Sequence, residues 1–196
     1  MRFRQLTCAV AVLIAVVSPA NSYADEPLCV GDQLNTAKAA MKKAKGALDK
    51  AIAAIDSKDD ATSRKLIEWF GARSSADGGK VRQVLVGSRV FADGAVYLCA
   101  IKSDVRLGEY YAYVRPDKAF VITLGNFFFS ASDSGFSSKL GTLIHEMTHF
   151  TVVGAAKDPK IYGVDEAKAL ARTNPDEAMK NAENIEYFVE AIYFGL

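Results

Sequence analysis

The chain has 196 residues, 50% of them hydrophobic, and its formal net charge is +1 at pH 7. A chain of this length can bury the core of one domain, and a charge so close to zero gives no basic field for nucleic acid. The composition therefore indicates a globular protein that does not bind nucleic acid, and its function has to be sought in individual motifs.

The first residues have the features of a secretory signal peptide. Arg2 and Arg4 form a basic start, Cys8–Val17 is an unbroken apolar run, and small residues precede a cleavage point after Ala24. The run is too short to cross a membrane, so we expect residues 1–24 to be removed and the protein to be exported, to a periplasm or out of the cell. A retained membrane anchor is the alternative.

The expected mature chain, residues 25–196, is a single domain without a membrane anchor, and we expect it to be a monomer. It keeps 22 of the 24 basic residues and all 23 acidic ones, a net charge of −1. Two cysteines remain, Cys29 and Cys99, and an even number in an exported protein favours one disulfide. Two buried free thiols and cysteine ligation of a metal are the alternatives.

The first half of this mature chain has the pattern of helices. Thr36–Ile55 is rich in Ala, Lys, Leu and Ile, and Asn35 is a suitable N-cap for it. A second helix is predicted over Ala61–Phe70. Lysines in the first helix alternate with alanines, which is more typical of a solvated helix face than of a binding patch.

Strands are predicted after Gly78–Gly79, which indicates a turn. The predicted strands are Val81–Val86, Ala95–Ile101, Tyr110–Val114 and Ala119–Phe129. Asp93–Gly94 is typical of a hairpin turn between two of them. In zinc peptidases generally, a sheet edge beside the zinc helix holds the substrate backbone as an added strand, and Phe120–Leu124 is the run nearest to the helix described next.

The only two histidines of the chain, His145 and His149, are four residues apart, and Glu146 follows the first. This is the HExxH pattern. A step of four residues on an α-helix puts both imidazoles on one face, where they can bind one tetrahedral zinc. Glu146 would then take a proton from a zinc-bound water, whose pKa the metal lowers to about 7. Apolar residues would bury the opposite face of the helix: Leu143, Ile144, Met147 and Phe150.

A catalytic zinc site needs a third protein ligand and one open position for water. Because no third histidine exists, the third ligand should be a carboxylate. The downstream candidates are Asp158, Asp165, Glu166, Glu183 and Glu186. Asp158 is best placed, because it follows Gly154, where the chain can leave the helix and turn back over the metal. The alternative for Asp158 is a turn residue before Pro159.

Here the sequence resembles the deuterolysin and peptidyl-lysine metalloendopeptidase family, the aspzincins. In that family HExxH is followed by Gly-Thr-x-x-Asp-x-x-Tyr-Gly, and this chain has Gly154, Asp158, Tyr162 and Gly163 in that order. Alanine replaces the threonine, and one extra residue separates Asp158 from Tyr162. The resemblance covers about Cys29–Glu190. It implies an α+β, zincin-like metallopeptidase domain with N-terminal helices, a small mainly antiparallel sheet, an HExxH helix and C-terminal helices.

The resemblance also implies roles for single residues. Asp158 would be the third zinc ligand, and Tyr162 would hydrogen-bond the oxyanion formed when the peptide carbonyl is attacked. In the lysine-specific branch, acidic side chains select a lysine just after the scissile bond, and Glu183 and Glu186 occupy the matching segment. The alternative is that these glutamates face solvent or support the zinc ligands.

The sequence therefore predicts a secreted endopeptidase that binds one Zn²⁺ per chain and cleaves protein or peptide substrates. Two alternatives stay open. One is a zinc peptidase with Glu166 or Glu186 as the third ligand and a different specificity. The other is a catalytically silent, zinc-stabilised binding protein, and Glu146 argues against it because a structural zinc site needs no base.

Overall fold

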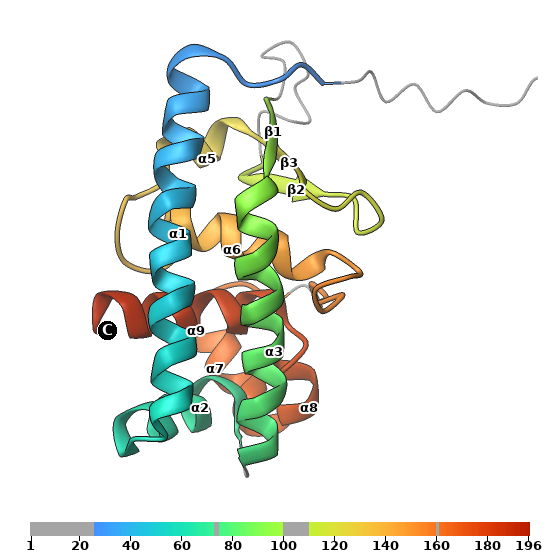
Figure 1. Cartoon of the computed structure of the whole chain (residues 1–196). Helices are drawn as coiled ribbons and strands as arrows, with labels where there is room; N and C mark the ends of the chain where they lie inside the picture. Colours follow the sequence, from blue (N-terminus) through green and yellow to red (C-terminus); the bar gives the residue numbers. More distant parts are fainter. Residues whose placement is uncertain (1–25, 73–74, 100–109, 160) are drawn as a thin grey trace, which may run out of the picture.

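The structure is a computed structural model and describes residues 26–72, 75–99, 110–159 and 161–196. The expected signal peptide therefore lies outside the described residues, as does the end of the strand predicted to reach Ile101. The long helices α1 and α3 run side by side, a small sheet lies near one end of them, and α6 and α9 cross behind them (Figure 1). The fold class is α+β, as the sequence indicated.

The N-terminal helices are α1 (Gly31–Ser57) and α2 (Asp60–Phe70). The start predicted for α1 is wrong: Asn35 lies inside the helix, and the N-cap position is Val30, which makes no side-chain cap. Gly31, with a φ of +53°, begins the helix two residues after the disulfide-bonded Cys29, so tertiary anchoring sets this boundary. The second helix forms where it was predicted.

The predicted turn at Gly78–Gly79 and the predicted strand Val81–Val86 are both wrong, because these residues belong to the helix α3 (Ser75–Phe91). Val81, Leu85 and Ser88 are almost fully buried, and their spacing places them on one helical face. This face packs among α1 and α6. A Cβ on Gly78 would lie only 3.3 Å from Leu66 Cδ1, so this glycine permits a close approach to α2.

The sheet has the strand order β1-β3-β2, with β1 Val96–Cys99, β2 Ala112–Val114 and β3 Val121–Leu124. Strands β1 and β3 are parallel and β2 is antiparallel to β3, so the sheet is mixed and the expectation of a mainly antiparallel sheet is wrong. The predicted hairpin at Asp93–Gly94 is also wrong. Those residues lie in the 3₁₀ turn η1 (Ala92–Gly94), which joins a helix, α3, to β1.

The longest predicted strand, Ala119–Phe129, divides into two elements. Its first part is β3, and Asn126–Ser130 forms the short helix α5. The remaining helices are α6 (Lys139–His149), α7 (Val164–Thr173), α8 (Pro175–Ala178) and α9 (Ala182–Phe194).

The predicted apolar face of α6 is confirmed. Leu143, Ile144, Met147 and the C-cap residue Phe150 are at most 1% exposed. They lie in the core that α6 shares with α1, α3 and α9. Burial of side chains of this size stabilises the fold by about 1.5 to 3 kcal/mol each, so the face opposite the histidines holds α6 rigidly.

A disulfide joins Cys29 to Cys99, as expected from the cysteine count, with 4.9 Å between the two Cα atoms. Backbone hydrogen bonds from Cys29 N to Tyr97 O and from Cys99 N to Pro27 O, both 2.9 Å, place the N-terminal segment along the outer edge of β1. This leaves β2 as the free edge of the sheet within the described residues. No helix among those residues is long and apolar enough to span a bilayer.

Candidate metal centre and cleft

Both histidines lie on one face of helix α6 because they are four residues apart. The start of the helix and its buried side fix the direction of that face. Ser138 is the N-cap, and its Oγ accepts a hydrogen bond of 3.2 Å from Gly141 N. The helix ends at His149, and the centroids of the His145 and His149 rings are 5.0 Å apart. The four-residue spacing therefore has the geometric consequence expected from the sequence.

A tight reversal after α6 brings Asp158 back over the histidines. The N–H groups of Val153, Gly154 and Ala155 all donate to the carbonyl oxygen of Phe150, at 2.8, 3.1 and 3.2 Å. Gly154 is placed in the turn as expected, but the residue with a left-handed backbone is Ala155, with φ +48°. A Cβ on Gly154 would lie 3.0 Å from Val84 Cγ2, so this glycine allows the turn to pack against α3.

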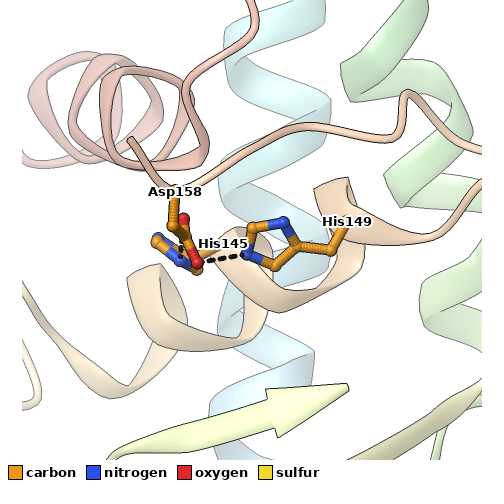
Figure 2. A group of neighbouring side chains, drawn as sticks. All are labelled: His145, His149 and Asp158. Carbon is orange, nitrogen blue, oxygen red and sulfur yellow. Dashed lines mark ion pairs between the residues drawn. The ribbon is translucent and has the colours of Figure 1, made fainter. Parts of the chain in front are cut away.

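The carboxylate of Asp158 lies between the two imidazoles (Figure 2). Its Oδ1 is 3.2 Å from His145 Nε2, and its Oδ2 is 3.1 Å from His149 Nε2. One ligand atom from each of the three residues lies within 4.8 Å of the others. The structure thus brings together the three residues expected to bind zinc.

The other ring nitrogens of the two histidines are held by the protein. His145 Nδ1 is 3.1 Å from Glu186 Oε2, and His149 Nδ1 is 2.8 Å from the carbonyl oxygen of Ala156. With Nδ1 bonded to the protein in both rings, Nε2 is the nitrogen left to bind a metal on the side of Asp158. Two imidazole nitrogens and one carboxylate with fixed orientations are the donor set of a catalytic zinc site with an open fourth position, so the residues fit zinc.

Negative charge gathers around these rings. Burial opposes protonation of His145, but its hydrogen bonds with Asp158 and Glu186 raise its pKa well above the ordinary value. Burial likewise works against the charged form of Asp158, but its hydrogen bonds with the two histidines hold its pKa well below the ordinary value. A site that stabilises positive charge on its rings is also one that attracts a cation.

Glu146 lies beside the histidines with only 7% of its surface exposed, and it lines the same cleft. Burial raises the pKa of its carboxyl group, although the histidines act in the opposite direction. A carboxylate with a raised pKa is a better proton acceptor, which suits the role of general base expected for this residue.

The cleft has a volume of about 680 Å³, with α6 on one side and residues 110–114 on another. These residues include β2, the free edge of the sheet. Phe120–Leu124, the run expected to offer that edge, overlaps the central strand β3, whose backbone already pairs on both sides. Proximity in sequence suggested the wrong strand because the sheet order is not the chain order.

The remaining expected site residues also line this cleft. Tyr162 lies at its rim with 65% of its surface exposed. Glu183 is half-buried, and its Oε2 accepts a hydrogen bond of 3.3 Å from Gly163 N. Glu186 is only 5% exposed and is bonded to His145, so it is placed to support this expected zinc ligand.

Sequence reasoning missed Glu190. This residue of α9 is fully buried and lies beside the start of α6. Its Oε1 accepts from Ser138 N at 2.9 Å and from Ser138 Oγ at 2.6 Å, and its Oε2 accepts from Ser137 N at 3.0 Å. Burial and the charge of Glu186 raise the pKa of Glu190 to about 8, and the serine donors act in the opposite direction. Its spacing of four residues from Glu186 was the signal available in the sequence.

Helix α6, the free strand edge beside it and the His-His-Asp donor set define a domain of the metallopeptidase type. Residues 55–190 match the aspzincin family model, described as lysine-specific metallo-endopeptidase. The chain belongs to this family.

Relatives support the assignment. A peptidyl-Lys metalloendopeptidase of Armillaria mellea is 37% identical over 132 residues, which are 66% of this chain and 36% of the relative. An extracellular protease of Aeromonas hydrophila is 30% identical over 169 residues, 83% of this chain and 45% of that protein. The chain thus spans less than half of these two relatives. A zinc peptidase from Grifola frondosa has a similar structure, with TM-score 0.75, 29% identity and coverage of 83% of this chain and 97% of the other.

Proposed function

We propose that this protein is a secreted zinc endopeptidase that cleaves protein or peptide substrates and prefers lysine just after the scissile bond. The observation that carries the proposal is the convergence of His145, His149 and Asp158 in a cleft that also contains the buried Glu146. Membership of a metallo-endopeptidase family supports it.

In this proposal His145 Nε2, His149 Nε2 and a carboxylate oxygen of Asp158 hold one zinc ion per chain. When bound, zinc supplies a Lewis acid that lowers the pKa of a water molecule toward neutrality. Glu186 and the Ala156 carbonyl keep the two rings in the orientation that binding requires. The alternative with Glu166 or Glu186 as the third ligand is disfavoured, because Asp158 is the carboxylate that lies with the two histidines.

Glu146 is proposed as the general base. It takes a proton from the attacking water and later gives it to the nitrogen of the leaving amine, so that the carboxylate is restored after each turnover. Tyr162, at the rim of the cleft, is proposed to donate its hydroxyl proton in a hydrogen bond to the carbonyl oxygen of the substrate as negative charge develops there.

The free edge of β2 is proposed to bind the substrate backbone in extended form. Backbone groups on a free strand edge lack partners in the sheet, and an added peptide strand supplies them. The acidic end of the cleft, formed by Glu183 and Glu186, would attract the ammonium group of a lysine. Glu183 is the more accessible of the two carboxylates, so direct contact is assigned to it.

Export is part of the proposal. Cleavage after Ala24 would release the mature chain 25–196 as one domain, and the Cys29–Cys99 disulfide suits an oxidising compartment. A relative named extracellular protease supports the same location. Whether that compartment is a periplasm or the medium is decided by fractionating the producing cells, and a monomer is expected on sizing.

The test is digestion of a denatured protein by the purified mature chain, with the fragments mapped by mass. We expect cuts on the amino side of lysine, about one zinc ion per chain, and loss of cleavage after chelation with recovery on adding zinc. Cleavage that persists without metal would contradict the zinc mechanism, and cuts without lysine enrichment would contradict only the specificity.

A further inference from the structure

One face of α9 contacts several parts of the cleft. Its members, spaced by three, four and seven residues from the first, are Glu183, Glu186, Tyr187 and Glu190. Helices α6 and α9 pack against each other, and Figure 1 shows them crossing behind α1 and α3. Glu183 bonds to Gly163 N, Glu186 to His145, and both Tyr187 and Glu190 to Ser137, so this one helix face supports several parts of the cleft.

Several acceptors at the acidic end of the cleft already have protein partners. An ammonium group has three N–H donors and accepts none, and a buried charge needs them paired. Glu186 is buried and already bonded to His145, and one oxygen of Glu183 already accepts from Gly163 N. Further oxygen atoms close to Glu183 would complete the pairing of all three donors.

Two hydroxyl groups supply them. Ser137 and Tyr187 both line the cleft, and Ser137 Oγ is 3.3 Å from Tyr187 Oη. A hydrogen bond also links Tyr187 to Glu183, and burial together with this bond raises the pKa of Tyr187, so its hydroxyl stays protonated. The oxygen atoms of Ser137, Tyr187 and Glu183 thus form a connected group at one end of the cleft.

The position of the Ser137 hydroxyl depends on an unusual backbone. Ser137 has a φ of +55°, a left-handed conformation that costs a non-glycine residue about 1 kcal/mol or more. Glu190 compensates for this, because its two oxygens hold the backbone N–H of Ser137 and both donors of Ser138. Glu190 is fully buried, and its two bonds with Ser138 are shielded from water.

We propose that Glu190 is a positioning residue for substrate selection: it holds Ser137 in its left-handed conformation, and Ser137 Oγ accepts a hydrogen bond from the lysine that follows the scissile bond. The inference rests on the proposed function, since it concerns the same cleft and the same lysine. Glu190 itself does not touch the substrate.

The test compares two peptides that differ only after the scissile bond, where one has lysine and the other norleucine, which has a similar length but no ammonium. In the zinc-loaded protein, Ser137→Gly should lower the ratio of kcat/KM for lysine over norleucine about tenfold, the effect of losing one hydrogen bond to a charged group. Glycine adopts positive φ without strain, so the backbone is kept. Ser134→Gly, an exposed serine of the same loop, is the matched control and should keep the wild-type ratio.

Glu190→Met, which removes both acceptor oxygens at similar length, should lower the same ratio about tenfold. The double variant Glu190→Met with Ser137→Gly should be no lower than the single variants, because both changes act through one hydroxyl. Loss of packing alone would lower both rates and leave their ratio unchanged. Glu177→Met, on the surface helix α8, is the control, and Glu190→Asp, which withdraws the carboxylate by one methylene, replaces Glu190→Met if that variant does not fold.

Binding gives a readout that needs no turnover. In the Glu146→Gln background, calorimetry should show about tenfold weaker binding of the lysine peptide for each variant, with zinc content unchanged by mass spectrometry. An unchanged lysine preference in Ser137→Gly, or effects that multiply in the double variant, would overturn this inference alone. A wild-type ratio near one would contradict the lysine preference itself.

Discussion

In each of the two histidines, the two ring nitrogens have different partners. The Nδ1 atoms are occupied by Glu186 and by the Ala156 carbonyl, whereas both Nε2 atoms face Asp158. One anchor is a buried carboxylate and the other is backbone, so neither ring depends on a mobile partner for its orientation. Such anchors are worth about 10- to 100-fold in metal affinity in comparable sites.

Replacement of Glu146 by Gln tests the base separately from the metal. Gln keeps the size of the side chain but does not accept the proton, so zinc content should be unchanged while kcat falls by at least about 10²-fold. Metal analysis and kcat on a peptide measure the two effects. Full activity in this variant would contradict the assignment of Glu146.

The third ligand is tested by a pair of variants. Asp158→Ala removes the carboxylate that lies 3.2 and 3.1 Å from the two histidines, so zinc affinity should fall by about 10²-fold or more. Glu166→Ala, which removes an exposed carboxylate on α7, should leave zinc affinity nearly unchanged. Competition with a chelator of known affinity measures both. The reverse pattern would mean that Asp158 is only a turn residue.

At this scale the sequence was informative wherever spacing along a helix sets the geometry. His145, Glu146 and His149 needed only the 3.6-residue period, and Asp158 was reached through the family pattern and the absence of a third histidine. The carbonyl of Ala156 has no side-chain signal, and Glu190 gains its role only because α9 crosses the start of α6. Such contacts depend on tertiary approach, which a single sequence does not reveal.

Among the elements, α6 and α9 approach each other closely at Gly141. An added Cβ on Gly141 would lie 2.0 Å from Glu190 Oε1 and 2.7 Å from Glu186 Oε1. The absence of a side chain at this position therefore allows two buried carboxylates to lie against α6. Both carboxylates have other partners there, one at His145 and one at Ser137 and Ser138.

Gly141→Ala should therefore destabilise the protein by about 3 kcal/mol and weaken zinc binding, because the carboxylates would be displaced from their partners. Urea unfolding and chelator competition are the measurements. Gly46→Ala is the matched control: it lies on the exposed face of α1 with nothing within 4 Å of the added Cβ. This control should raise stability by about 0.5 to 1 kcal/mol. Equal effects of the two substitutions would contradict the packing argument.

Element prediction succeeded where periodicity was strong and failed where two periods fit the same residues. The run Val81–Val86 suits a strand by composition, and only its burial at positions 81, 85 and 88 identifies a helical face. Gly78–Gly79 resembled a turn because a glycine that permits close helix packing has the same sequence signal as one that permits a turn. The mixed sheet order was out of reach, since no local pattern specifies which strands pair.

In the molecule as a whole, the cleft lies where three separately anchored parts meet. Helix α6 is fixed by the core, the β2 edge by the sheet, and the acidic end by α9. The N-terminal segment lies on the opposite edge of the sheet, along β1, where Cys29 joins Cys99. A change at the disulfide should therefore affect stability more than chemistry.

The disulfide prediction is that replacing both Cys29 and Cys99 with Ser lowers the free energy of unfolding by about 4 kcal/mol, because the bond closes a long loop in the unfolded chain. The melting temperature should fall by roughly 10 °C. The hydrogen bonds of Cys29 N to Tyr97 O and of Cys99 N to Pro27 O do not need the sulfur atoms, so the native arrangement persists at low temperature. Zinc content and kcat at 15 °C should then match the wild type.

Unfolding by urea measures the loss of stability, and a peptide assay measures kcat. An unchanged midpoint would contradict the contribution assigned to the bond, and lost activity in a folded variant would show that the edge at β1 is coupled to the cleft through the sheet.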